Sequence, residues 1–176
     1  MFIVDIETTG LNGIRAGDKI VEVGIVKLTP EGVEDVYSAI VQHPDIEEFS
    51  DCWVFQNTDL TTEEVKNGVP EENVIRELRR ILNGELATSY NVKFDFDKFL
   101  YQWPYGVFPI VPFDIMEVSS QYFNPYGDKG KWVRSEQAYN LLFPDDNPAL
   151  GEKQTHRALD DARREAYILL GLLGMF

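Results

Sequence analysis

Cysteine and histidine are scarce in this chain. Its 176 residues include one cysteine, Cys52, and two histidines. A single cysteine excludes a disulfide within the chain and is typical of proteins from a reducing compartment, so we expect a cytoplasmic protein. The same counts disfavour a structural zinc site made of Cys and His, because such a site takes four of these ligands.

No segment of the sequence is apolar for long enough to cross a membrane. The apolar stretch at residues 168–176 falls far short of the ~20 residues that a transmembrane helix needs. We interpret it as the end of a final helix that packs on the core. The N-terminus carries an acid at Asp5 and no basic region before an apolar run, so it does not resemble a secretion signal. We therefore expect no membrane partner.

Basic residues are outnumbered by acidic ones. The chain has 16 Lys and Arg against 30 Asp and Glu, which gives a net charge of −14. Phosphate backbones repel such a surface, which disfavours extensive wrapping around a nucleic-acid duplex but allows contact with a short strand end. The hydrophobic content of 44% is that of a globular protein, and the length fits a single domain over residues 1–176.

Hydrophobic patterns predict an α/β domain. Strands are predicted from residue 2 and at residues 19–28, 33–41, 86–90 and 110–114, and helices at 70–82, 94–103, 115–123, 135–143 and 158–173. The short turn at residues 29–32 favours an antiparallel hairpin of the second and third strands. Residues 44–70 are acidic and irregular, apart from a helix start at residues 61–64. We therefore predict a mixed five-stranded sheet flanked by helices.

Two carboxylates stand at the end of the first strand. Asp5 and Glu7 occupy alternate positions, so both side chains leave the same face of the strand, whereas Ile6 points into the protein. Carboxylates this close raise each other's pKa unless a cation lies between them. Oxygen-only acidic sites favour a hard divalent cation such as Mg²⁺ or Mn²⁺. By itself, the pair is equally compatible with a solvated strand end.

A further acid follows the predicted strand at residues 86–90. Asp95 falls in the first turn of the next helix, where loops place functional residues at strand ends. Its alternative role is a favourable interaction with the helix dipole.

The last helix carries two adjacent acids, Asp160 and Asp161, after His156. The side of this helix that faces the sheet comprises Ala158, Ala162, Glu165, Ala166, Leu169 and Leu172. Asp161 flanks that side, whereas Asp160 lies opposite it, beside Arg164. An acid at the edge of a buried face needs a partner. Asp161 is therefore the candidate metal ligand, and Asp160 is expected to be solvated.

The four acids and His156, in this order and spacing, resemble the DnaQ-like DEDDh exonucleases, the family of proofreading 3′–5′ exonuclease domains. The matching residues are Asp5 to Gly10 in the first motif, Asn91 with Phe94 and Asp95 in the second, and His156 with Asp161 in the third. The tyrosine-type sister class would carry Tyr four residues before the last acid, where this chain has Arg157. The resemblance covers nearly the whole chain and implies an RNase H-like fold.

The resemblance also implies an activity, hydrolysis of phosphodiester bonds at the 3′ end of single-stranded nucleic acid, with DNA favoured. Asp5, Glu7, Asp95 and Asp161 would hold two divalent cations, Mg²⁺ or Mn²⁺, and His156 would act as general base. The implied substrate-binding residues are Thr8, Thr9, Gly10, Leu11, Asn91 and Phe94. Among them, the amides of Thr8 and Thr9 would hold the terminal 3′ group, and Leu11 would wedge against the last base. The alternative role of Leu11 is that of a turn residue packed on the core.

Two departures from the family pattern concern the substrate rather than the metal ligands. Tyr90 stands where many members have His, and residues 55–60 contain no His-Gly-Ile segment. DNA and RNA therefore both stay open as substrates, because their discrimination depends on a few contacts near the sugar. The alternatives are an exoribonuclease that trims short RNA, a non-catalytic docking module and a phosphoesterase for small nucleotides. Besides the nucleic-acid end, a DNA polymerase or another replication or repair protein is one candidate partner, and action as a stand-alone enzyme is the alternative.

Overall fold

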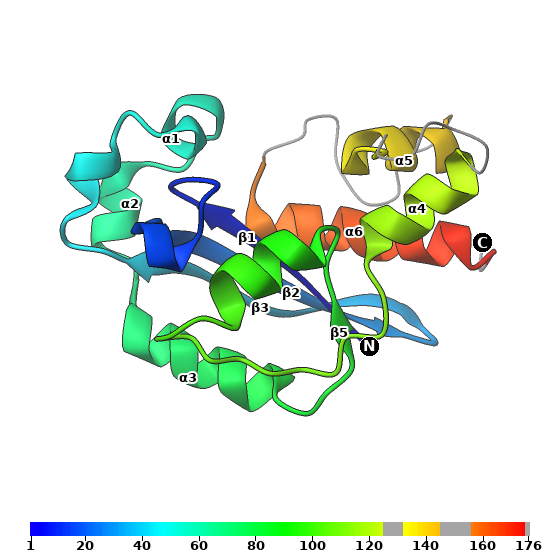
Figure 1. The fold of residues 1–176 in the computed structure, drawn as a ribbon, viewed down its shortest axis with the longest axis horizontal. Helices are drawn as coiled ribbons and strands as arrows, with labels where there is room; N and C mark the ends of the chain where they lie inside the picture. The colour runs from blue at the N-terminus through cyan, green and yellow to red at the C-terminus, as the bar shows by residue number, and fades with distance from the viewer. Residues whose placement is uncertain (125–131, 145–155, 175–176) are drawn as a thin grey trace.

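A five-stranded mixed sheet with helices on both faces forms the centre of the protein, as predicted (Figure 1). The computed structural model describes residues 1–124, 132–144 and 156–174. The strands are β1 (Phe2–Thr8), β2 (Ile20–Thr29), β3 (Gly32–Gln42), β4 (Val69–Pro70) and β5 (Ala87–Thr88), in the order β4-β3-β2-β1-β5. The pairs β1–β2 and β2–β3 are antiparallel, which confirms the predicted hairpin, and β4 and β5 pair in parallel at the two edges.

The predicted helices are present, with small shifts at their ends. The α-helices are α1 (Trp53–Asn57), α2 (Thr62–Lys66), α3 (Glu71–Leu82), α4 (Ile115–Phe123), α5 (Ser135–Leu142) and α6 (Ala158–Leu172). Two short 3₁₀ segments, η1 (Ile14–Ala16) and η2 (Ile46–Phe49), and a π-helix, η3 (Lys93–Leu100), complete the set in the described ranges. At the start of α2, Thr61 and Glu64 form the reciprocal capping box that their spacing predicts.

The predicted strand at residues 110–114 is wrong. Only a single parallel bridge forms there, between Leu86 and Ile110, and the strand predicted at 86–90 shrinks to the two residues of β5. The fifth strand is instead β4, just before α3. A two-residue edge strand has no room for alternation, so its sequence carries no periodic signal.

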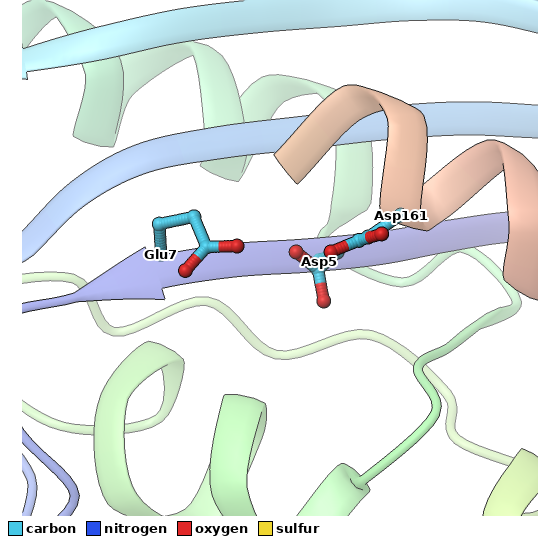
Figure 2. A group of neighbouring side chains, drawn as sticks. All are labelled: Asp5, Glu7 and Asp161. Atoms are coloured by element: carbon cyan, nitrogen blue, oxygen red, sulfur yellow. The ribbon is translucent and has the colours of Figure 1, made fainter. Parts of the chain in front are cut away.

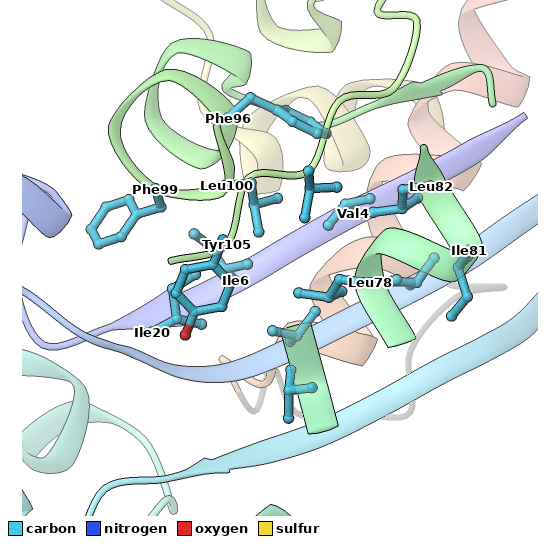
Figure 3. Close-up of a cluster of buried hydrophobic side chains, with 14 of the residues drawn as sticks. Val4, Ile6, Ile20, Leu78, Ile81, Leu82, Phe96, Phe99, Leu100 and Tyr105 are labelled. Carbon is cyan, nitrogen blue, oxygen red and sulfur yellow. The ribbon is translucent and has the colours of Figure 1, made fainter. Parts of the chain in front are cut away.

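Apolar residues pack against both faces of the sheet. On one face, Val4 and Ile6 of β1 contact the cluster that includes residues of α3 and η3 (Figure 3). On the other face, Ile3 packs with residues of α4, α5 and α6. Asp5 and Glu7 alternate with Val4 and Ile6, so they leave β1 on the face that α6 covers.

The segment predicted as a helix at 94–103 is a π-helix that ends earlier, at Leu100. Its wider turn is seen in the hydrogen bond from the Tyr101 amide to the Phe96 carbonyl, at 2.8 Å, which spans five residues. Such turns are rare and occur frequently at functional sites. In this one, Asp95 and Phe96 are both buried.

The start of α6 lies very close to β2. A methyl group on Gly24 would approach the backbone of Ala158 and Leu159 to 2.3 Å, so only glycine fits there. Beside it, the guanidinium of Arg157 donates to both carboxylate oxygens of Glu22, at 2.8–3.0 Å. Glu22 is 3% exposed. This bidentate pair and the close glycine contact hold the start of α6 against β2.

Within the described residues, no helix has the length and apolar character needed to cross a membrane. The cytoplasmic location and the assignment of residues 1–176 to one domain stay predictions.

Candidate active site

Three carboxylates from two elements converge above the end of β1. Asp5 and Glu7 come from the strand, and Asp161 comes from the first turn of α6 (Figure 2). Each offers an oxygen atom, and these atoms all lie within 4.8 Å of one another. The register of β1 against β2 shifts between Glu7 and Thr8, as at a β-bulge, a feature common beside active sites. The structure thus brings together the two acids that strand alternation places on one face and the acid of the last helix that helical phase selects.

Asp95 reaches the same site from η3. A cavity of about 340 Å³, at the small end of the usual range for ligand sites, is lined by Asp5, Asp95, Asp161 and His156 among others. Asn91 supports the turn that carries Asp95. Its side-chain oxygen accepts the Phe94 amide at 3.2 Å, and its backbone carbonyl accepts the Asp95 amide at 3.0 Å. Asn91 and Phe94 also line the cavity.

Burial and mutual repulsion raise the pKa of the acids in this cluster. Burial is the largest cause for each of them, and it raises the pKa of Asp95 to about 7. The pKa values of Asp5 and Glu7 lie well above their ordinary range, because burial is reinforced by neighbouring carboxylates. The pKa of Asp161 is raised less, since the positive charge of Arg164 opposes the effect of burial. Without a bound cation, the cluster therefore destabilises its own charged state.

The residues suit a divalent cation. The three grouped ligands are all carboxylates, which is the donor chemistry that Mg²⁺ and Mn²⁺ prefer. The Oδ2 atom of Asp5 is buried and accepts no hydrogen bond from any described residue. A buried carboxylate oxygen without a partner is costly, and a cation would supply the missing interaction.

His156 lies at the cavity, directly before α6. Its ring meets the edge of the Trp53 ring at a centroid distance of 5.6 Å and an angle of 84°. Its backbone φ of 48° is unusual for a residue other than glycine, although histidine tolerates it better than most. The residue lines the same cavity as Asp5 and Asp161.

The turn after β1 is not among the residues that line this cavity. The Thr9 amide donates to the Lys19 carbonyl at 3.0 Å, which continues the pairing of β1 with β2. In this structure the Thr9 amide already donates a hydrogen bond within the protein, so it is not available to bind the 3′ end of a strand. The Thr8 hydroxyl donates to the Gly10 carbonyl at 2.8 Å.

Leu11 projects from this turn into solvent. It is 72% exposed, which excludes the alternative of a turn residue packed on the core. Its carbonyl accepts a hydrogen bond from Lys98 at 2.7 Å, so the turn is tied to the end of η3. A methyl group on Gly10 would meet the Asp18 carboxylate at 2.3 Å, so that side chain would have to shift.

Two residues of the site escaped the sequence interpretation. Glu165 was assigned to the packing face of the last helix, yet it lines the cavity, is 3% exposed and accepts the Tyr90 amide at 3.2 Å. The signal was present, since a carboxylate on a buried helix face needs a partner as much as Asp161 does. Burial, with repulsion from Asp95 and Asp161, raises its pKa well above the ordinary range.

The second missed residue is Arg164, which the sequence analysis placed beside Asp160. That placement is wrong. Arg164 is 3% exposed and pairs with Asp161, whereas Asp160 pairs with Arg163 at 2.7 Å. Both pairs are separated by three residues, a spacing at which side chains are neighbours on a helix. Charge spacing alone allowed either partner, and only the burial of α6 against β1 distinguishes them.

The comparisons with known proteins identify the family. The model of the RNase_T exonuclease family matches residues 2–169, so the chain belongs to this family, and the predicted DnaQ-like exonuclease resemblance is confirmed. The PolC-type DNA polymerase III of Thermotoga petrophila is 28% identical over 177 residues, and the 3′-5′ exonuclease DinG of Bacillus subtilis is 26% identical over 174 residues. These matches cover 98% and 97% of this chain but only 12% and 17% of the relatives, so the chain is similar to a small part of each.

A solved structure shares the fold. Exonuclease X in complex with 5′ overhanging duplex DNA superposes with a TM-score of 0.64, covering 99% of this chain and 91% of that chain at 20% identity. The predicted RNase H-like fold is thereby confirmed.

Proposed function

We propose that this chain is a metal-dependent 3′–5′ exonuclease that acts on single-stranded ends, with DNA as the favoured substrate. The observation that carries the proposal is the convergence of Asp5, Glu7 and Asp161 within 4.8 Å beside a cavity that Asp95 and His156 also line. The relative named as a 3′-5′ exonuclease supports the polarity. Membership of an exonuclease family supports hydrolysis over a docking role.

The reaction consumes one water molecule per nucleotide. Water attacks the phosphorus of the last phosphodiester, the bond from phosphorus to the 3′ oxygen breaks, and a nucleoside 5′-monophosphate leaves while the strand keeps a new 3′ hydroxyl. Two divalent cations bound here would activate the water and neutralise charge on the attacking and leaving oxygens. The four carboxylates Asp5, Glu7, Asp95 and Asp161 would hold them.

His156 is proposed as the general base. A neutral imidazole has one ring nitrogen that can accept the proton of the attacking water. The contact with Trp53 orients its ring at the cavity. The neighbouring Asp161 carboxylate would stabilise the protonated imidazole.

A polymerase partner is part of the proposal. The relatives from Thermotoga are named as DNA polymerases, and this chain matches a segment that is 12% of their length. A chain of this size that corrects 3′ ends would serve such an enzyme as a domain or a bound subunit.

Oligonucleotide digestion tests the activity. Purified protein is incubated with 5′-labelled single-stranded DNA or RNA in Mg²⁺, Mn²⁺ or EDTA. We expect a ladder that shortens from the 3′ end on DNA in Mg²⁺ or Mn²⁺, and no cleavage in EDTA. Cleavage in EDTA, or products that shorten from the 5′ end, would refute the proposal. A ladder on RNA alone would replace DNA by RNA as the substrate.

A further inference from the structure

Arg164 is buried, and one of its guanidinium nitrogens has no hydrogen-bond partner among the described residues. Its guanidinium pairs through Nη1 with Asp161, but Nη2 is buried and has no hydrogen-bond partner among the described residues. The side chain is 3% exposed. A buried N–H of a charged group that stays unpaired costs more than a neutral one, so a partner is expected to arrive from outside the chain.

The cavity next to Arg164 is strongly acidic. Asp5, Asp95, Asp161 and Glu165 all line it, and among its lining residues the basic side chains are Arg134, His156 and Arg164. Arg134 is exposed at the start of α5, whereas Arg164 lies within the cluster. A fixed positive charge would add to that of any bound cation in attracting an anionic ligand, and among the lining residues Arg164 is the buried basic side chain.

Arginine is also the side chain best suited to donate hydrogen bonds to two anions at once. Its planar fork presents five donors, so Nη1 can hold Asp161 while Nη2 donates to an oxygen of a phosphate. A lysine in this place would neutralise Asp161 but would not offer a second donor in a fixed direction. A phosphodiester matches this arrangement, because its single negative charge is shared between two non-bridging oxygens and either of them can accept a hydrogen bond from Nη2.

We propose that Arg164 is a phosphate-binding residue, whose Nη2 donates to a non-bridging oxygen of the terminal phosphate of the substrate strand. The inference rests on the proposed function and adds a specific contact to it. Arg164 thereby contributes to substrate binding and, through Asp161, ties the position of that phosphate to the carboxylate cluster.

Ligand binding without turnover tests this role. Thymidine 5′-monophosphate, which carries the phosphate of the proposed product, and thymidine, which lacks it, are titrated into the protein in Ca²⁺. In Arg164→Lys we expect the affinity for the monophosphate to fall roughly tenfold to a hundredfold, the effect of losing a charge-assisted hydrogen bond. The affinity for thymidine should not change.

Arg163→Lys is the matched control. Arg163 is the preceding residue of the same helix, but it pairs with Asp35 and Asp160 outside the cavity. This variant should bind the monophosphate as the wild type does. Calcium affinity, measured separately by calorimetry, should be the same in all three proteins.

The outcomes separate the possible roles of Arg164. Unchanged monophosphate affinity in a folded Arg164→Lys variant overturns the proposal. A parallel loss of calcium affinity overturns it too, because Arg164 would then act only by positioning Asp161. If the variant unfolds, a crystal structure of the wild type with Ca²⁺ and thymidine 5′-monophosphate decides the question by whether a phosphate oxygen lies within hydrogen-bond distance of Nη2.

These failures differ from failure of the proposed function. If the wild type degrades oligonucleotides from the 3′ end but Arg164→Lys binds the monophosphate normally, the proposed function stands and only the Arg164 contact is refuted. If the wild type neither degrades oligonucleotides nor binds the monophosphate, both the proposed function and this contact are refuted.

Discussion

In the absence of metal, the Asp95→Asn variant should be more stable than the wild type, and the difference in the free energy of unfolding should grow as the pH rises. Asp95 is 4% exposed, and burial raises its pKa from an ordinary value of 3.8 to about 7. Asn has nearly the same shape and cannot ionise. The variant therefore removes the cost of the buried charge while it keeps the packing of η3.

The sign follows from proton binding. Because the pKa of Asp95 is higher in the folded than in the unfolded protein, the stability that its bound proton contributes is fully present below about pH 4 and is lost as the pH rises through 7. A difference of about 3 between the two pKa values corresponds to about 4 kcal/mol over the full range. Of this, roughly 2–3 kcal/mol falls between pH 5 and pH 8. Between pH 5 and pH 8, the free energy of unfolding of Asp95→Asn should therefore rise by that amount relative to the wild type.

Urea unfolding in EDTA measures the effect. The free energy of unfolding of the wild type and of Asp95→Asn is determined at pH 5 and pH 8. Asp97→Asn serves as control, because Asp97 is exposed on the same π-helix. The reasoning is refuted if Asp95→Asn changes the free energy of unfolding equally at both pH values. Addition of Mg²⁺ at pH 8 should raise the stability of the wild type more than that of the variant, since a ligand stabilises the state that binds it.

Two further variants test the roles assigned to the start of α6. Asp161→Asn should remove most of the nuclease activity and Asp160→Asn little of it, because only Asp161 lies within the carboxylate cluster; the reverse ranking in oligonucleotide digestion would show that the third motif is misaligned. His156→Ala should lower kcat by about 10²–10⁴-fold with Mg²⁺ affinity unchanged, the range for loss of a general base. Near-normal turnover in this variant would exclude His156 as the base.

The positions of the metal-ligand candidates were predictable because they depend on local geometry. Alternation along a strand places Asp5 and Glu7 on one face whatever the rest of the fold does. Helical phase distinguishes Asp161 from Asp160 in the same way. The order of the motifs added the family, and with it the expectation that Asp95 joins them. Local periodicity and motif spacing are therefore sufficient to predict these four residues.

The edge strands were less predictable. β4 and β5 contain two residues each, and their pairing depends on which segments the helices bring beside β3 and β1. The stretch at 110–114 has a strand-like composition but forms only one bridge, to Leu86. The π-helical turn of η3 was also invisible, because one extra residue in a turn changes no hydrophobic pattern that a short segment can display.

The amino-acid sequence by itself determined the α/β class, the central hairpin, the helical faces and the order of the acidic motifs, since each of these follows from side-chain periodicity and turn chemistry along a continuous segment. The tertiary structure alone decided how Arg164 and Glu165 are used. Helical phase placed Glu165 on the sheet-facing side and Arg164 away from it, but both line the cavity because α6 packs onto the sheet beside β1, in contact with Gly24 and with the Glu22–Arg157 pair at its start. Contacts between segments 135 residues apart depend on burial and close approach, which no local pattern encodes.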